Sequence, residues 1–167
     1  MTATSPPPGT PPFDATTAAA LVAPLLGAPA PLIEAMHVLQ DHFGYVHPEA
    51  VALLADRLNL SRAEVHGVLT FYDYFRTSPP GRHVLRLCRA EACQARGAEA
   101  LVAQAARSLG CALHETSADG AITLEAVYCL GNCACAPSAL LDTTLHGRLD
   151  ADGLDALIGA ARAEVAA

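Results

Sequence analysis

Four of the six cysteines in this 167-residue chain fall in two closely spaced pairs. Cys88 and Cys93 have four residues between them, and Cys129 and Cys133 have three. Thiolates are soft metal ligands, and four of them can hold either a 2Fe-2S cluster or a structural zinc ion. In a cytoplasmic protein such thiols serve as metal ligands or buried small hydrophobes more often than as disulfides. The chemistry that these residues offer is therefore metal binding through sulfur.

The spacing within the pairs favours a cluster but leaves two alternatives open. Each iron of a 2Fe-2S cluster takes two thiolates, which two pairs of cysteines can supply. Structural zinc also tolerates pairs of this length. A dithiol redox enzyme is less favoured because the chain has no C-x-x-C motif. Cys135 follows Cys133 after one alanine and could substitute for it as a ligand, whereas Cys111 is expected to be a buried small hydrophobe.

Each cysteine pair follows directly after a predicted strand, and these strands determine where the pairs lie. Residues His83 to Leu87 predict a strand that ends just before Cys88, and Ile122 to Tyr128 predict another that ends just before Cys129. If these strands are neighbours in one sheet, the loops that follow them emerge side by side. The four thiolates can then converge on one site.

Residues inside and beside the loops favour a negatively charged centre. Gly131 allows a backbone conformation closed to other residues, which lets amide groups approach the sulfur atoms. The start of a helix predicted from Gly97 to Leu109 would also favour an added electron. Arg89 and Arg96 lie close by in the sequence, either to add to this effect or to remain exposed and solvated.

The pattern around these elements predicts two domains after a proline-rich tail. Residues 1–13 form the predicted mobile tail, 14–78 a helical bundle and 82–167 an α/β domain, with the boundary at the TSPPG segment. In the second domain, Ala139 to Asp142 and His146 to Leu149 predict a hairpin, and a closing helix follows. The fold class is therefore α/β.

Helical signals are strong before the boundary. Ala18 to Ala30 predicts a helix, and an apolar face from Leu32 to Phe43 predicts another that ends at Gly44. Ser61 and Glu64 have the spacing of a capping box, which predicts the start of a helix that runs to Phe75. Its end carries Phe71, Tyr72 and Tyr74, which could anchor a protein partner if they are exposed.

Composition excludes several classes of function. The net charge is −7 and all ten basic residues are arginine, which argues against a nucleic-acid partner. No uninterrupted run of about 20 apolar residues predicts a membrane span, so we expect a soluble, cytoplasmic protein. No nucleophile with a neighbouring base, phosphate-binding glycine loop or carboxylate pair stands out. The chain is therefore expected to be non-catalytic by itself.

Three segments carry a resemblance to a known family. They are FGYVHPEAVALLADRLNLSRAEVHGVLTFYDYF, LCRAEACQARG and YCLGNCACAP. From about residue 30 to the end, the chain resembles the small thioredoxin-like 2Fe-2S subunit of NADH dehydrogenases. The family pattern, C-x4-C and then C-L-G-x-C followed by Ala-Pro, is complete in this sequence.

The resemblance implies a fold, a cofactor and a partner. The fold is an N-terminal helical bundle followed by a thioredoxin-like domain. The cofactor is one 2Fe-2S cluster, and the residues that match the family's ligands are Cys88, Cys93, Cys129 and Cys133. The partner is a larger flavoprotein that carries FMN and binds NAD, and the cluster exchanges electrons with its flavin.

Within the family, the sequence looks most like the gamma subunit of soluble, molybdenum-dependent, NAD-linked formate dehydrogenases. The extra Cys135 and the charged RAEA segment between Cys88 and Cys93 support this expectation. It implies a further partner, a larger subunit with a molybdenum cofactor and iron-sulfur clusters. The alternatives are the equivalent subunit of NADH:quinone oxidoreductase or of an NAD-reducing hydrogenase and, from another class, a zinc-stabilised assembly module.

Overall fold

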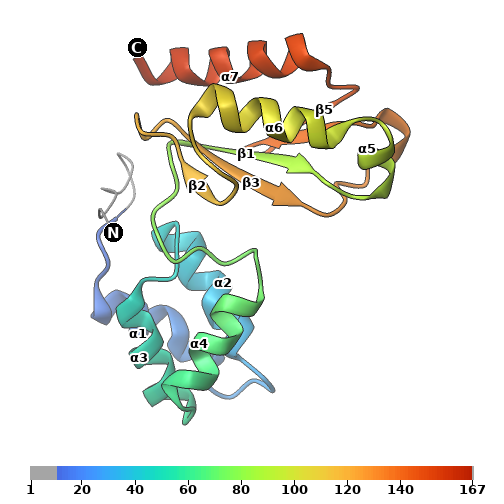
Figure 1. The fold of residues 1–167 in the computed structure, drawn as a ribbon. Coiled ribbons are helices and arrows are strands. Elements are labelled where there is room, and N and C mark those ends of the chain that lie inside the picture. The colour runs from blue at the N-terminus through green and yellow to red at the C-terminus, as the bar shows by residue number, and fades with distance from the viewer. Residues whose placement is uncertain (1–10, 167) are drawn as a thin grey trace. The chain divides into compact units, whose positions relative to one another are not determined.

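The computed structural model describes residues 11–166, and the chain divides into two compact units between Pro79 and Pro80 (Figure 1). Most of the tail predicted for residues 1–13 lies outside the described residues. Within them, no helix is long and apolar enough to cross a membrane. The two units are described separately below.

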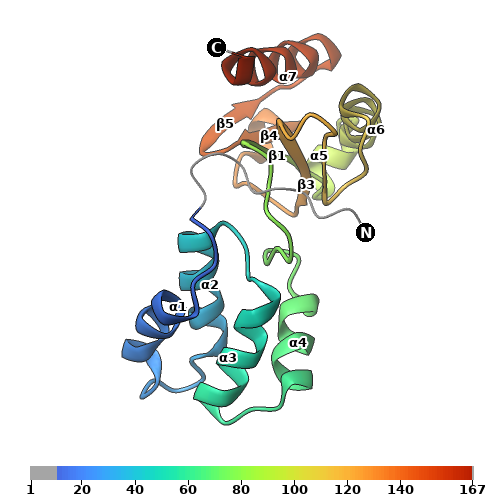
Figure 2. The same ribbon diagram turned by 90° about the vertical axis from the view of Figure 1, so that its left-hand side faces the viewer.

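The first unit is entirely helical in its described part. Its α-helices are α1 (Ala15–Val22), α2 (Leu32–Phe43), α3 (Pro48–Leu58) and α4 (Arg62–Phe71), with a short 3-10 helix, η1 (Ala23–Leu25), after α1 (Figure 2). Gly44 ends α2 in a left-handed conformation with φ of 77°, as predicted. The capping box of Ser61 and Glu64 is also confirmed, because each side chain accepts a hydrogen bond from the other residue's backbone N–H.

Two predicted helices are shorter in the structure. The helix expected from Ala18 to Ala30 is α-helical only to Val22, because Pro24 lies in the following 3-10 turn and Gly27 and Pro29 come soon after. α4 ends at Phe71 rather than at Phe75. The backbone is extended at Tyr72, and Phe75 enters the core from the turn beyond it.

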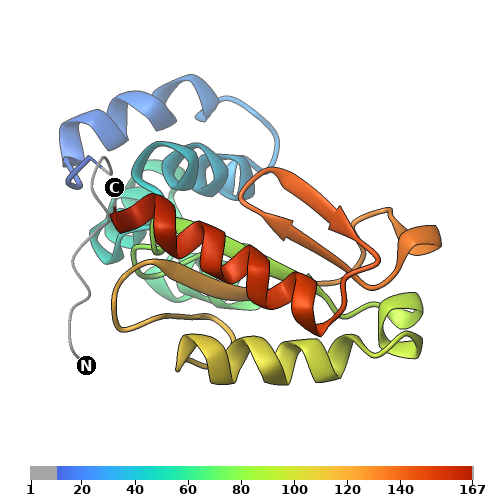
Figure 3. The same cartoon turned by 90° about the horizontal axis from the view of Figure 1, so that it is seen from above.

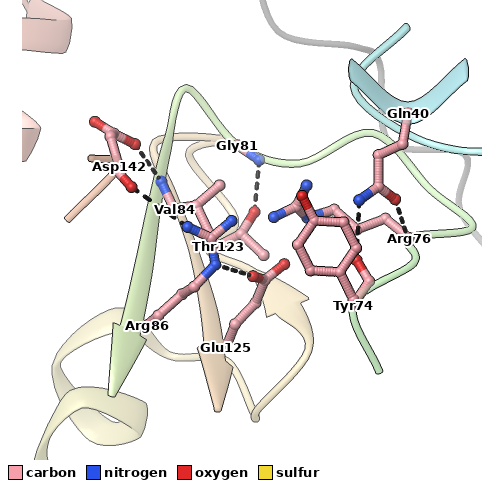
Figure 4. A network of polar contacts seen from close by, with 9 residues as sticks. All are labelled: Gln40, Tyr74, Arg76, Gly81, Val84, Arg86, Thr123, Glu125 and Asp142. Atoms are coloured by element: carbon pink, nitrogen blue, oxygen red, sulfur yellow. Dashed lines mark hydrogen bonds and ion pairs between the residues drawn. The ribbon is translucent and has the colours of Figure 1, made fainter. Parts of the chain in front are cut away.

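A buried glutamine holds the segment after α4. The Gln40 side chain donates to the carbonyl of Tyr74 at 2.9 Å and accepts from the N–H of Arg76 at 2.7 Å (Figure 4). Because one amide satisfies a backbone donor and a backbone acceptor, it fixes this segment against α2. The apolar core of the unit takes its largest fully buried side chains from Val22, Met36, Leu39, Phe43, Val46, Leu54 and Val65.

The second unit is a five-stranded sheet in the order β2-β3-β1-β4-β5. The strands are β1 (His83–Cys88), β2 (Glu115–Thr116), β3 (Ile122–Val127), β4 (Ser138–Leu141) and β5 (Thr144–Gly147). The helices are α5 (Glu91–Ala95), α6 (Ala98–Leu109) and α7 (Ala151–Ala166), with a 3-10 helix, η2 (Cys133–Cys135), before β4.

The predicted neighbourhood of the two strands before the cysteines is confirmed. β1 and β3 are adjacent and parallel, and Cys88 is in register with Val127. The second strand of the predicted hairpin is misplaced by two residues. It begins at Thr144, because Asp142 adopts a left-handed φ of 52° and Leu141 already pairs with Thr144 across a two-residue turn. α5 and β2 were not expected from the sequence.

Helices α6 and α7 cover one face of this sheet (Figures 1 and 3). Their apolar side chains pack against alternate residues of β1 and β3, such as Leu85 and Leu124, which share one face of adjacent strands. The buried members contributed by the helices are Leu101, Val102, Ala105, Leu109, Leu154, Ile158 and Ala161.

The other face of the sheet carries polar groups (Figure 4). Arg86 and Glu125 occupy matching positions on β1 and β3 and form an ion pair of 3.0 Å, with side chains only 22% and 12% exposed. Asp142, just after β4, holds the start of β1 by accepting from the N–H of Val84 at 2.8 Å. These contacts fix the strand that ends at Cys88.

Candidate metal centre

The first cysteine pair lies where β1 ends. Cys88 is the last residue of the strand, and Cys93 lies in α5, the one-and-a-half-turn helix that follows. Both residues are only 3% exposed. The backbone of α5 turns Cys93 back toward the strand, and the two sulfur atoms are in contact. The secondary structure of the unit therefore holds this pair in place.

The second pair lies in the irregular segment after β3. Cys129 has a left-handed φ of 88°, and Cys133 begins η2. Their sulfur atoms are 3.8 Å apart, and the N–H of Gly131 donates to the Cys129 sulfur at 3.4 Å. Gly131 has a φ of 74°, which matches the prediction that its flexibility brings an amide to a sulfur. In contrast to the first pair, both cysteines are exposed.

The two loops meet at Cys88. Burial acts to raise the pKa of its thiol, but hydrogen bonds from the N–H groups of Ala90, Cys129 and Leu130, together with the contact with Cys93, lower the pKa overall. Because two of these N–H groups belong to the second loop, the structure brings both predicted pairs to one place. The thiolate, which is the form that binds metal, is favoured at Cys88.

Two of the other cysteines, Cys93 and Cys133, have the opposite pKa shift. Burial raises the pKa of the Cys93 thiol, and the nearby Cys88 raises it further. Contact with Cys129 raises the pKa of Cys133. Negative charge on one sulfur disfavours charge on its neighbours, so four thiolates this close need a positive centre between them.

The arrangement fits the demands of a 2Fe-2S cluster. The sulfur atoms form two contacting pairs, and such a cluster takes two thiolates on each of its irons. The N–H of Gly131 already points at the sulfur of Cys129, and such donors stabilise a centre with excess negative charge. Among the described residues, no three His, Cys, Asp or Glu side chains are arranged around a position for a single metal ion.

The two remaining cysteines differ in their distance from this centre. Cys111 is half-buried and packs against the core of the sheet, and burial raises the pKa of its thiol. The structure does not bring it to the four other cysteines. Cys135, at the end of η2, lies beside them, and its carbonyl accepts a hydrogen bond from the N–H of Arg148.

Charged residues around the centre fall into two groups. Arg89 forms a two-pronged ion pair with Glu99 in the first turn of α6, at 2.9 and 3.0 Å. Arg96 and Arg148 have no ion-pair partner among the described residues. The sequence did not predict Arg148 as a site residue, because it follows β5 and only the fold of the hairpin brings it to the second cysteine loop.

A family model for thioredoxin-like 2Fe-2S ferredoxins matches residues 19–162. The chain belongs to this family. The family confirms the predicted fold, a helical N-terminal region followed by a thioredoxin-like 2Fe-2S domain, and it is consistent with one 2Fe-2S cluster.

Several curated relatives are similar to this chain over most of its length. The chain is 38% identical over 128 residues to a subunit of the NADH-quinone oxidoreductase of Pseudomonas aeruginosa, and the match covers 77% of each chain. It is 33% identical over 126 residues to the corresponding protein of Escherichia coli, covering 75% of this chain and 76% of that one. The HndA protein of an NADP-reducing hydrogenase from Solidesulfovibrio fructosivorans is 29% identical over 118 residues, or 71% of this chain and 69% of that one.

Solved structures include a similar fold. The crystal structure of an NAD⁺-reducing NiFe hydrogenase in its air-oxidized state matches 80% of this chain with a TM-score of 0.65 and 26% identity. The match covers 23% of the hydrogenase chain, so most of that chain has no counterpart here.

Proposed function

We propose that the chain is an electron-transfer subunit that holds one 2Fe-2S cluster on Cys88, Cys93, Cys129 and Cys133. The observation that carries this proposal is that β1 and β3 are adjacent, parallel strands that end at Cys88 and two residues before Cys129, in a chain of the 2Fe-2S family. A bound cluster would take up and release one electron at a time. The residues of this chain supply its ligands, its hydrogen bonds and its position.

The electrons are proposed to pass to and from a larger flavoprotein that carries FMN and binds NAD. The relatives support this role, since they are subunits of NADH-quinone oxidoreductases and of an NADP-reducing hydrogenase. They favour an NADH:quinone oxidoreductase or a pyridine-nucleotide-reducing hydrogenase as the host. Formate dehydrogenase, with its molybdenum subunit, stays a prediction that none of these relatives supports.

Metal analysis of the purified, anaerobically reconstituted chain tests the proposal. We expect about two irons and two acid-labile sulfides per chain, with a rhombic EPR signal after reduction. One zinc per chain and no visible colour would instead establish the assembly module. Metal-free protein with titratable thiols and disulfide reductase activity would establish a dithiol enzyme.

Isolation of the chain with its natural partners tests the host. Co-purification with an FMN-containing subunit is expected in each case. Quinone-reducing subunits, NiFe subunits or a molybdenum subunit in the same complex would then distinguish the three hosts. Absence of any flavoprotein from the purified complex would contradict the proposed role.

We also propose that residues 14–78 and 82–167 are separate domains with separate tasks. Phe71 and Tyr74, which are 76% and 53% exposed, lie at the end of the helical unit and support a docking role for it. A chain that begins at residue 79 is expected to keep its cluster but to bind the flavoprotein less tightly. Loss of the cluster from this shortened chain would contradict the division of tasks.

A further inference from the structure

A cavity of about 590 Å³ opens on the wall of the candidate centre. One of its lining residues is Cys133, so whatever fills the cavity lies against a proposed cluster ligand. Six of its nine lining residues, here called the floor, are apolar and belong to α5, the second cysteine loop and the segment before α7. These apolar residues are Ala92, Ala95, Ala134, Ala136, Pro137 and Leu149.

The polar side chains of the cavity are two arginines. Arg96, just after α5, and Arg148, just after β5, line it together, and no described lining residue is acidic. Neither guanidinium has an ion-pair partner among the described residues, in contrast to Arg89, Arg86 and Arg162. On a chain with a net charge of −7, the cavity therefore concentrates unneutralised positive charge.

The backbone places Arg148 at the cavity at a conformational cost. Its φ is 52°, a left-handed conformation that is uncommon for residues other than glycine. The N–H of Arg148 donates to the carbonyl of Cys135 at 2.5 Å, which ties this strained residue to the cysteine loop. The second arginine is thus held at the cavity by the same loop that carries Cys133.

We propose that this cavity is the docking site for an acidic segment of the flavoprotein partner. The inference rests on the proposed function and names the contact through which that partner reaches the centre. A carboxylate side chain pairs with Arg96 and Arg148, and neighbouring apolar side chains cover the alanine, proline and leucine floor. Guanidinium groups suit this role because their fork of donors matches a carboxylate in geometry.

The lining distinguishes a protein segment from a small anion. A phosphate ion alone would leave most of a cavity of this size, and its apolar floor, in contact with water. A nucleotide is poorly matched, because the described lining has no aromatic ring for a base and no glycine loop for phosphates. A chain segment with alternating acidic and apolar side chains can pair with the two arginines and also cover the apolar floor of the cavity.

Charge reversal tests the docking site in the cluster-bearing full chain. The double variant Arg96→Glu/Arg148→Glu is expected to bind the FMN-containing subunit about 100-fold more weakly, measured by calorimetry at low salt. The control Arg107→Glu, which reverses an exposed arginine on α6, should change the affinity less than about threefold. Raising the salt concentration should weaken binding of the unmodified chain more than that of the double variant.

The double variant must keep its cluster for its affinity to test the docking site. The EPR signal of the double variant must match that of the unmodified chain; if its cluster is lost, the pair Arg96→Gln/Arg148→Gln takes its place, with about tenfold weaker binding expected. Equal affinity of variant and control overturns the docking site and leaves the proposed function intact. An unmodified chain that fails to bind any FMN-containing subunit removes both. Calorimetric binding of inorganic phosphate or NAD⁺ to the unmodified chain, lost in the double variant, would identify a small-anion site instead.

Discussion

The two cysteine pairs of the candidate centre are built in opposite ways. Cys88 and Cys93 belong to a strand and an α-helix and are buried, whereas Cys129 lies in the loop after β3, Cys133 begins a short 3-10 helix, and both are exposed. The first pair takes its position from the core of the sheet. The second pair depends on local turns and on the backbone contacts of the hairpin. The fold therefore fixes one half of the site, whereas local turns hold the other half, which is exposed.

Serine substitution of the ligands should produce the largest effects and separates the two halves. Each of Cys88→Ser, Cys93→Ser, Cys129→Ser and Cys133→Ser is expected to lose the visible absorbance and EPR signal of the cluster. Cys88→Ser should also lower the free energy of unfolding of the apoprotein by about 1 kcal/mol, since it alters a buried, hydrogen-bonded group. Cys133→Ser should leave that free energy within about 0.5 kcal/mol, because its side chain is exposed.

Cys111→Ser is the control for these variants and should keep its full cluster. A full cluster in Cys133→Ser would contradict the proposed ligand set. If that cluster then disappears in the double variant Cys133→Ser/Cys135→Ser, Cys135 is the substitute ligand that its spacing suggested.

The stability of the part that carries the buried cysteine pair should depend on contacts of the strand β1. Replacing Arg86 with Leu removes the 3.0 Å ion pair that joins β1 to Glu125 of β3. We expect a loss of about 2 kcal/mol in the free energy of unfolding by urea, the usual contribution of a hydrogen bond to a charged group. Arg82→Leu, an exposed change just before the same strand, should cost less than about 0.5 kcal/mol. Similar losses in both variants would mean that the ion pair does not support the strand.

The same contrast explains what the sequence could and could not predict. Strand periodicity placed β1 and β3, and the cysteine pattern placed both loops at their ends, because these signals are local. The helix α5 was missed because five residues, three of them alanine or cysteine, carry no clear periodicity. The hairpin strand β5 was misplaced because its register depends on the two-residue turn at Asp142, which carries no glycine to mark it in the sequence. The position of Arg148 at the cavity depends on that register, so the sequence alone could not predict it.

The exposed cysteine pair should respond to a larger side chain at Gly147, which packs against the second cysteine loop. A Cβ atom at Gly147 would lie 2.6 Å from the side-chain nitrogen Nδ2 of Asn132, 2.9 Å from the Cβ atom of Cys135 and 3.0 Å from the Cys135 carbonyl oxygen. Gly147→Ala must therefore move the segment around Cys133, and we expect a loss of about 2 kcal/mol in stability. The EPR g-values of the reduced cluster should shift as well.

Gly131→Ala is the matched comparison within the same loop. Its Cβ would meet no atom within 4 Å, and only its left-handed φ of 74° opposes the change. The expected cost is about 1 kcal/mol, without a contact that displaces Cys133. If Gly131→Ala destabilised the protein more than Gly147→Ala, packing behind the loop would not be what positions the exposed pair.

The smallest expected effect concerns the ion pair that ties the first loop to α6. The hydrogen bond from Arg89 holds the pKa of Glu99 below its ordinary value of 4.5. A carboxyl group with a lowered pKa in the folded state stabilises the fold above its unfolded pKa, and this contribution disappears as the pH falls through the folded pKa. Arg89→Gln should therefore lower the urea midpoint slightly at pH 7 and not at all once Glu99 is protonated. Arg107→Gln, on the same helix, should show no such pH dependence. A loss for Arg89→Gln that persists in acid would mean that the arginine acts through packing of its side chain rather than through Glu99.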